Sequence, residues 1–75
     1  MTHSAAANIG KQLSRLRKSR GISQMKLSKQ CKLSLGCIAS VEAGRRFPSF
    51  QTLIRLCEVL GAKFSLVVQK KESSK

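Results

Sequence analysis

Serine and glycine residues at recurring positions divide this sequence into short helical segments. A serine side chain can accept a hydrogen bond from the first turn of a helix, and a serine precedes three apolar periodic runs, at Ser23, Ser34 and Ser49. Glycine adopts the left-handed conformation that often ends a helix, and helical runs stop at Gly21, Gly44 and Gly61. The segments are far shorter than a membrane span, so the sequence predicts one small domain of packed helices.

Apolar residues recur at helical spacing in four segments, which predict a mainly α, compact four-helix domain over residues 8–61. Asn8 is the predicted N-cap of the first helix, and residues 1–7, which show no periodicity, are predicted to form a flexible arm. The second helix should end near Cys31 and the third at Ala43–Gly44. The side chains expected to point inward are Ile9, Leu13, Leu16, Leu27, Cys31, Leu33, Ile38, Val41, Phe50, Leu53, Ile54, Cys57 and Leu60.

The pattern changes after Gly61. Residues 63–69, KFSLVVQ, have the β-branched and aromatic composition of a strand, but the chain offers no second strand to pair with it. An isolated strand is unstable in water, so we expect residues 62–69 to pair with the same strand of a second subunit through Phe64, Leu66 and Val68. A homodimer is also expected because a core built from 75 residues is marginal by itself. Residues 70–75 should form a disordered basic tail.

The charge balance indicates a polyanionic partner. The chain has 15 Lys and Arg against 3 Asp and Glu, a formal net charge of +12. A module that binds RNA or a membrane surface is the alternative to one that binds DNA. Membrane binding would favour one long amphipathic helix, and RNA binding would favour exposed aromatic side chains, whereas this chain has short helices, 3 Phe and no Trp or Tyr. Double-stranded DNA is therefore the expected partner, and a membrane is not.

The reactive residues do not form a catalytic or metal-binding pattern. Cys31, Cys37 and Cys57 are odd in number and lack CxxC spacing, and the single histidine, His3, lies in the predicted arm. Asp is absent and the three Glu residues are scattered, so no nucleophile has an evident base. We therefore expect neither an enzyme nor a cofactor or metal. The absence of an apolar leader and the unpaired cysteines predict a cytoplasmic, nucleoid-associated protein.

About forty residues resemble the helix-turn-helix domains of the lambda-repressor-like, or XRE, family. The matching residues are Arg17, Gly21, Ser23, Gln24, Leu27, Leu33, Ser34, Ile38, Glu42, Gly44, Arg45, Arg46, Pro48, Ser49, Thr52 and Leu53. The resemblance implies a sequence-specific transcriptional repressor that binds a two-half-site operator as a dimer, with residues 35–43 as the recognition helix. A short helix, a tight turn and a second short helix can present one face to the major groove.

Two groups of DNA-contacting residues are predicted. Helix N-termini bind phosphate through free backbone N–H groups, which makes the three serine caps candidate phosphate sites. With the positions that the resemblance implies, the expected phosphate contacts are Ser23, Gln24, Lys32, Ser34, Arg45, Arg46 and Ser49. The expected base contacts are Leu35, Gly36, Cys37 and Ser40. This recognition helix is weakly polar for the family, so part of the discrimination should come from the deformability of the DNA.

The resemblance also implies one structural interaction and one further partner. Glu42 corresponds to a family position that forms an ion pair with Arg17, and this pair should join the first helix to the end of the third. The ending LGAKFSLVVQ is similar to that of HipB-type antitoxins, which bind a kinase-like toxin. Two interpretations stay open: an autoregulatory antitoxin of a toxin-antitoxin operon, and a phage-type or stand-alone XRE regulator without a toxin partner.

Overall fold

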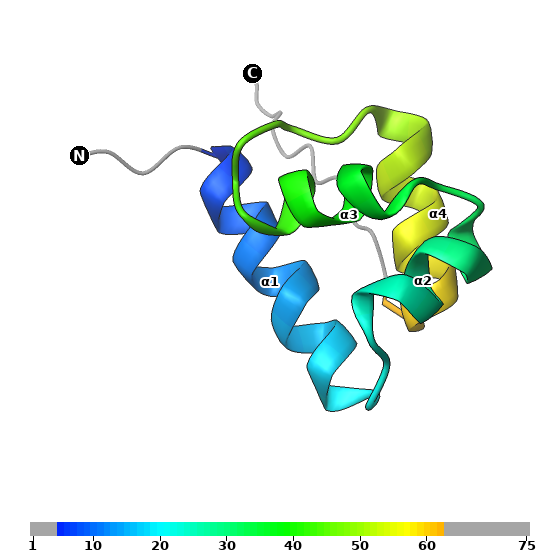
Figure 1. The fold of residues 1–75 in the computed structure, drawn as a ribbon. Coiled ribbons are helices and arrows are strands. Elements are labelled where there is room, and N and C mark those ends of the chain that lie inside the picture. Colours follow the sequence, from blue (N-terminus) through cyan, green and yellow to red (C-terminus); the bar gives the residue numbers. More distant parts are fainter. Residues whose placement is uncertain (1–4, 63–75) are drawn as a thin grey trace, which may run out of the picture.

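The computed structural model describes residues 5–62, which form four α-helices around one core (Figure 1). The helices are α1 (Ala5–Ser19), α2 (Gln24–Cys31), α3 (Leu35–Glu42) and α4 (Phe50–Leu60). The predicted mainly α, four-helix fold is confirmed for this part of the chain. None of its helices is long and apolar enough to cross a membrane. The predicted strand, with Phe64, Leu66 and Val68, and the predicted tail lie outside the described residues.

The predicted serine caps are confirmed. The hydroxyl oxygens of Ser23, Ser34 and Ser49 accept hydrogen bonds from the backbone N–H groups three residues later, and Ser34 Oγ lies 3.0 Å from the nitrogen of Cys37. The prediction of Asn8 as the first cap is wrong, because α1 already begins at Ala5. Alanine has the highest helix propensity, so residues 5–7 extend the helix although they contribute no apolar periodicity.

The helix ends follow the predicted glycines and one residue that the sequence did not indicate. Gly21, Gly44 and Gly61 have φ values of 70°, 77° and 73°, in the left-handed region that favours glycine. Lys32 also has a positive φ, 58°, and its N–H donates to the last turn of α2. The turn between α2 and α3 is therefore closed by a lysine in a conformation that side chains seldom adopt.

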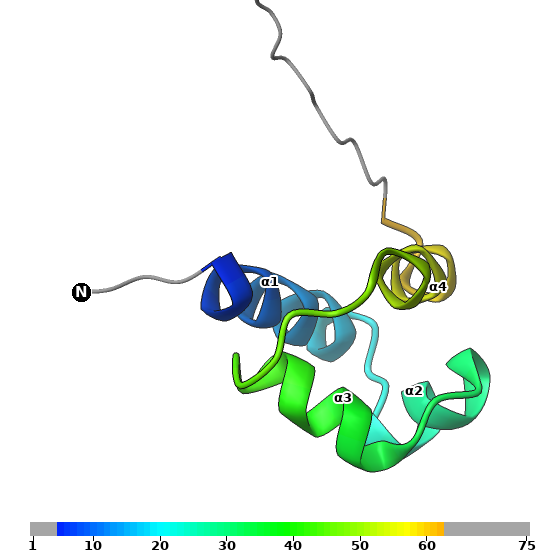
Figure 2. The same ribbon diagram turned by 90° about the horizontal axis from the view of Figure 1, so that it is seen from above.

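The four helices enclose the core, and α3 packs against both α1 and α2. In Figure 2, α1 and α4 lie above α2 and α3. The core residues are Leu13, Leu27, Cys31, Ile38, Val41, Leu53, Leu56, Cys57 and Leu60. The prediction that Phe50 faces inward is wrong, since its side chain is 61% exposed and Leu56, at 2%, takes part in the core instead. Phe50 is the first residue of α4 and lies one turn beyond the stripe formed by residues 53, 56, 57 and 60.

Helix α1 approaches the end of α3 unusually closely at Gly10. A Cβ atom at this position would overlap the carbonyl oxygen of Val41 and lie 2.7 Å from that of Glu42. Only a residue without a side chain lets the two backbones come this near. Gly10 therefore fixes how α3 is held against α1, a role that its place inside a helix did not suggest.

Candidate nucleic-acid interface

Helix α3 is held on one side and open on the other. The side chains of Ile38 and Val41 are each 1% exposed, and both belong to the core cluster. The turn before α3 is closed by the N–H of Leu33, which donates to the carbonyl oxygen of Ser28 at 2.9 Å. α3 therefore has a single orientation relative to α2, with its outer face available to a partner.

The exposed part of α3 is its N-terminal turn. Ser34, Leu35 and Gly36 are exposed, and the side chain of Leu35 is 42% exposed. Cys37 and Ser40, the other two predicted base contacts, are half-buried. An apolar leucine, a glycine and a serine hydroxyl at the tip leave few hydrogen-bonding groups, so this surface suits shape recognition and apolar contact better than bidentate hydrogen bonding.

The predicted phosphate contacts lie mostly on the surface. The exposed members are Ser23, Lys32, Ser34, Arg45, Arg46 and Ser49. Each serine hydroxyl is bound to the third residue of its helix, as 3.0 Å between Ser23 Oγ and the nitrogen of Lys26 illustrates. The first N–H groups of an α-helix have no acceptor within the helix, so the capped starts of α2 and α3 favour an anion.

The two arginines lie in the loop that joins α3 to α4. The N–H of Arg45 donates to the carbonyl oxygen of Ser40 at 3.0 Å, so this loop is tied to the last turn of α3. Arg45 and Arg46 are both exposed. α3 thus has a serine cap at its start and two long cationic side chains just past its end. The two ends of a helix of this length are about 12 Å apart.

Glu42 is the acceptor of a three-donor cluster at the end of α3. Arg17 Nε and Nη2 lie 2.7 Å and 3.0 Å from the two oxygens of Glu42, and Gln24 Nε2 lies 3.0 Å from Oε1. Arg17 Nη1 also donates to the carbonyl oxygen of Ile22 at 2.7 Å. The ion pair that the family resemblance implied is present, and it joins α1, α2 and α3 at one point.

The position of Gln24 adds something that the sequence did not indicate. This residue was expected to anchor a DNA phosphate, yet it is half-buried and one of its amide hydrogens is directed to Glu42. The two residues are 18 positions apart, a separation that carries no local sequence signal. Gln24 therefore links the start of α2 to the ion pair, and only its remaining polar atoms are left for a phosphate.

The environment of Glu42 keeps it ionised. Burial by itself would raise the pKa of this carboxyl, but the hydrogen bonds from Arg17 and Gln24 and the charge of Arg17 outweigh that effect and hold its pKa below the usual value. The side chains of Arg17 and Glu42 are only 10% and 8% exposed. The acid is neutralised by its own arginine, so it does not oppose the surrounding positive surface.

The cysteines take no part in this surface cluster. All three are free thiols, with Cys31 and Cys57 buried and Cys37 half-buried on α3. Burial raises the pKa of the Cys31 and Cys57 thiols, which favours their protonated form. Within residues 5–62, no group of three His, Cys, Asp or Glu residues is placed to hold a metal ion.

Comparison with known proteins agrees with this geometry. Residues 8–67 match the family model of the helix-turn-helix domain. A search of curated proteins finds no match. The fold is similar to the crystal structure of the clp gene regulator ClgR from Corynebacterium glutamicum, with a TM-score of 0.78 and 27% identity over 80% of this chain and 64% of that one.

Two further solved structures are similar. The restriction-modification controller protein C.AhdI from Aeromonas hydrophila gives a TM-score of 0.77 and 26% identity over 81% of this chain and 92% of that one. An HTH_3 family transcriptional regulator from Vibrio cholerae gives 0.73 and 31% over 77% and 33% of the two chains. This chain thus spans less than two thirds of that ClgR structure, 80% of a second ClgR structure and nearly all of C.AhdI. These matches support the XRE, lambda-repressor-like class, and the chain belongs to the helix-turn-helix domain family.

Proposed function

We propose that this protein is a transcriptional repressor that binds double-stranded DNA with α3 in the major groove. The observation that carries the proposal is the exposed N-terminal turn of α3, held rigidly by a buried inner face on a chain with a net charge of +12. A helix fits into a groove about 12 Å wide. The similarity to regulators of known structure supports the same function. Such a protein would bind DNA in the cytoplasm.

In this arrangement the tip of α3 contacts the bases. Leu35 offers an apolar surface to a thymine methyl group, Gly36 lets the helix approach closely, and Ser40 and Cys37 contact the groove wall. The hydroxyl of Ser34 can donate while its oxygen caps the helix. With so few hydrogen-bonding groups, base contacts supply part of the specificity and DNA deformability supplies the remainder.

The phosphate contacts surround the tip. The N-termini of α2 and α3, capped by Ser23 and Ser34, receive phosphates through backbone N–H groups, and Ser49 at the start of α4 contributes a third site. Lys32, Arg45 and Arg46 supply positive charge beside them, and Gln24 contributes its remaining polar atoms. These contacts orient the protein on the duplex but do not distinguish sequences.

Replacing Arg46 by alanine tests this arrangement. Each phosphate contact contributes roughly 0.9 to the slope of log K against log salt, so Arg46→Ala should flatten the slope by about that amount and weaken binding to all sequences similarly. Arg15→Ala is the matched control, because Arg15 is an exposed arginine of α1 that borders the α1–α4 side of the molecule. Fluorescence anisotropy over a salt series measures both. An unchanged slope for Arg46→Ala would remove Arg46 from the interface.

We also propose that the protein binds its operator as a dimer. Residues Phe64, Leu66 and Val68 would bring two copies together, and two recognition helices would then meet half-sites about one helical turn apart. Removing residues 63–75 should give a monomer that binds the operator poorly. Analytical ultracentrifugation of the truncated protein provides the measurement, and a truncated protein that stays dimeric would place the interface elsewhere.

The regulated target and the protein partner define two versions of this function. The ending of the sequence supports an autoregulatory HipB-type antitoxin with a kinase-like toxin, whereas the similarity to ClgR and C.AhdI supports a stand-alone regulator. Footprinting on the DNA upstream of its own gene, with RNA as competitor, tests DNA binding against the RNA alternative. Co-expression with an adjacent kinase-like reading frame distinguishes the two versions, because only an antitoxin should copurify with that product.

A further inference from the structure

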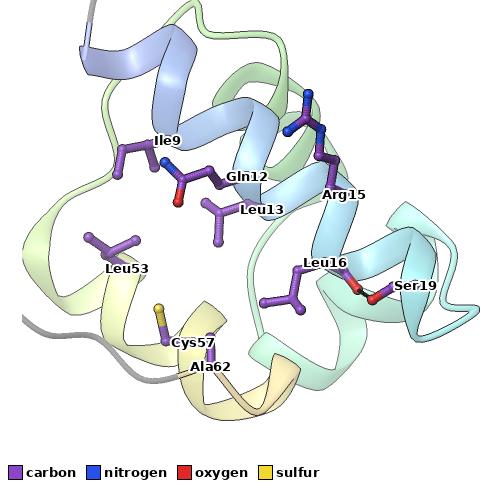
Figure 3. Close-up of a pocket in the computed structure, with 9 residues that line it drawn as sticks. All are labelled: Ile9, Gln12, Leu13, Arg15, Leu16, Ser19, Leu53, Cys57 and Ala62. Carbon is purple, nitrogen blue, oxygen red and sulfur yellow. Dashed lines mark hydrogen bonds between the residues drawn. The ribbon is translucent and has the colours of Figure 1, made fainter.

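An apolar groove of about 520 Å³ lies between α1 and α4. Figure 3 shows Ile9, Leu13 and Leu16 of α1 directed toward Leu53 and Cys57 of α4 across this groove. Ala62, the last described residue, lies in its wall. Leu13, Leu53 and Cys57 are buried members of the core, whereas Ile9 and Leu16 are only half-buried. Partly exposed apolar side chains are stabilised when another apolar segment covers them.

The groove is separate from the proposed DNA interface. Its lining residues come from α1, from α4 and from Ala62. In Figure 2, α1 and α4 lie above α2 and α3, and the residues that line the groove include none from α2 or α3. A segment seated in the groove would therefore leave the tip of the recognition helix accessible.

We propose that the groove is occupied by residues 64–68 of the same chain. Their sequence, FSLVV, places Phe64, Leu66 and Val68 on one face of an extended segment, because successive side chains alternate. The groove begins at Ala62, so only Lys63 separates its wall from this apolar face. The next apolar residues after Ala62 are thus close enough in the chain to reach the groove between α1 and α4.

The length and direction of the groove fit this segment. Arg20 Nε donates to the carbonyl oxygen of Leu60 at 2.8 Å, which places the end of α4 beside the end of α1. A chain leaving Ala62 can therefore run back along α1 from Leu16 toward Ile9. That stretch of helix is about 10 Å long at 1.5 Å per residue. An extended segment from residue 64 to residue 68 covers about 13 Å at 3.3 Å per residue.

This occupancy is compatible with pairing between subunits. Side chains of a strand stand perpendicular to its hydrogen-bonding edges, so a segment whose apolar face lies on the groove keeps its backbone N–H and C=O groups for a second strand. The groove would then hold the segment in place before any second copy arrives. The inference does not depend on DNA binding, and it adds to the proposed function the surface that supports the dimerisation segment.

Cys57 in the groove wall permits a direct test by disulfide trapping. A disulfide requires Cα atoms within about 7 Å, so a cysteine replacing Leu66 or Val68 should pair with Cys57 at least about tenfold faster than one replacing Ser65, on the opposite face. The variants are made in full-length protein carrying Cys37→Ser, which removes the most accessible native thiol. Diamide is the oxidant, peptide mass spectrometry identifies the bonded pair, and far-UV circular dichroism verifies the fold.

The pairing must be within one chain. A mixture of ¹⁵N-labelled and unlabelled protein separates the arrangements, since an intrachain disulfide never joins a labelled to an unlabelled peptide, whereas interchain disulfides include such mixed pairs. Intrachain pairing of Cys57 with position 66 or 68 supports the proposal. Equal rates at positions 65 and 66, absence of pairing, or interchain pairing would overturn it, the last by assigning the groove to a second copy. DNA binding is measured on the unmodified protein, which keeps Cys37, so a failure of the proposed function is seen separately.

Discussion

Replacing Glu42 by glutamine should destabilise the domain strongly, because three donors converge on this one carboxylate. Arg17 Nε, Arg17 Nη2 and Gln24 Nε2 all lie within 3.0 Å of its oxygens. A glutamine keeps one acceptor oxygen and presents an NH₂ group where the second oxygen was, so donor faces donor. Arg17, with 10% of its side chain exposed, would keep its bond to Ile22 and one bond to the remaining oxygen, but would lose the other. The positive charge would then be buried without its counter-charge.

Removing one partner of a buried ion pair costs roughly 3–5 kcal/mol. This is a large part of the free energy of unfolding of a small domain, which begins at about 5 kcal/mol. In a domain of this size each kcal/mol lowers Tm by roughly 4–8 °C, so Tm should fall by at least about 12 °C. Thermal and urea unfolding followed by far-UV circular dichroism measure the loss.

A matched control and a double variant isolate the cause. Glu58→Gln makes the same chemical change at an exposed position of α4 and should leave Tm nearly unchanged. Combining Glu42→Gln with Arg17→Met should cost less than the sum of the two single changes, because no stranded charge remains. If Glu42→Gln melts at the same temperature as Glu58→Gln, the ion pair contributes nothing to stability and the reasoning is refuted.

Three further results are expected. Gly10→Ala should destabilise the domain by about 1–3 kcal/mol through overlap with Val41. Gly36→Ala, with open space around its Cβ, should stabilise it by up to about 1 kcal/mol. Urea unfolding without DNA measures both, and equal changes in the free energy of unfolding would contradict this prediction. Because folding lowers the pKa of Glu42, its stabilisation is complete above the unfolded value, roughly 4.3, and is lost as pH falls through the folded value. Tm should thus drop more between pH 5 and pH 3 in the parent than in Glu42→Gln. Parallel curves of Tm against pH for the two proteins would contradict this pH dependence. Ser34→Ala should cost about 1 kcal/mol by removing a cap, and an unchanged unfolding curve would dismiss that contribution.

The positions of the helices followed largely from local chemistry. Each serine cap bonds to an N–H three residues away, and a glycine with positive φ ends α4 within one turn. Such interactions depend on neighbours in the chain, so a sequence pattern reveals them. The start of α1 departed from the pattern, because alanines extend a helix without any apolar periodicity to mark it. The exposure of Phe50 differs from the prediction as well, because Phe50 begins α4 one turn before the residues that reach the core.

The arrangement of the candidate site depended on contacts between distant residues. The resemblance to a family indicated Arg17 and Glu42, but not that Gln24, 18 positions before Glu42, donates to the same carboxylate. The approach of α1 to α3 at Gly10 and the groove between α1 and α4 were likewise visible only in the folded chain.

By itself, the sequence determined a small, strongly basic protein made of short helices with defined starts and ends, and it indicated DNA as the partner. Caps, turns and charge are properties of single residues and their near neighbours, so they can be inferred without coordinates. Only the tertiary structure decided which end of α3 is exposed, how its acid is neutralised and which apolar surface stays open. Those features arise from side chains that meet across the core, where sequence separation carries no information about distance.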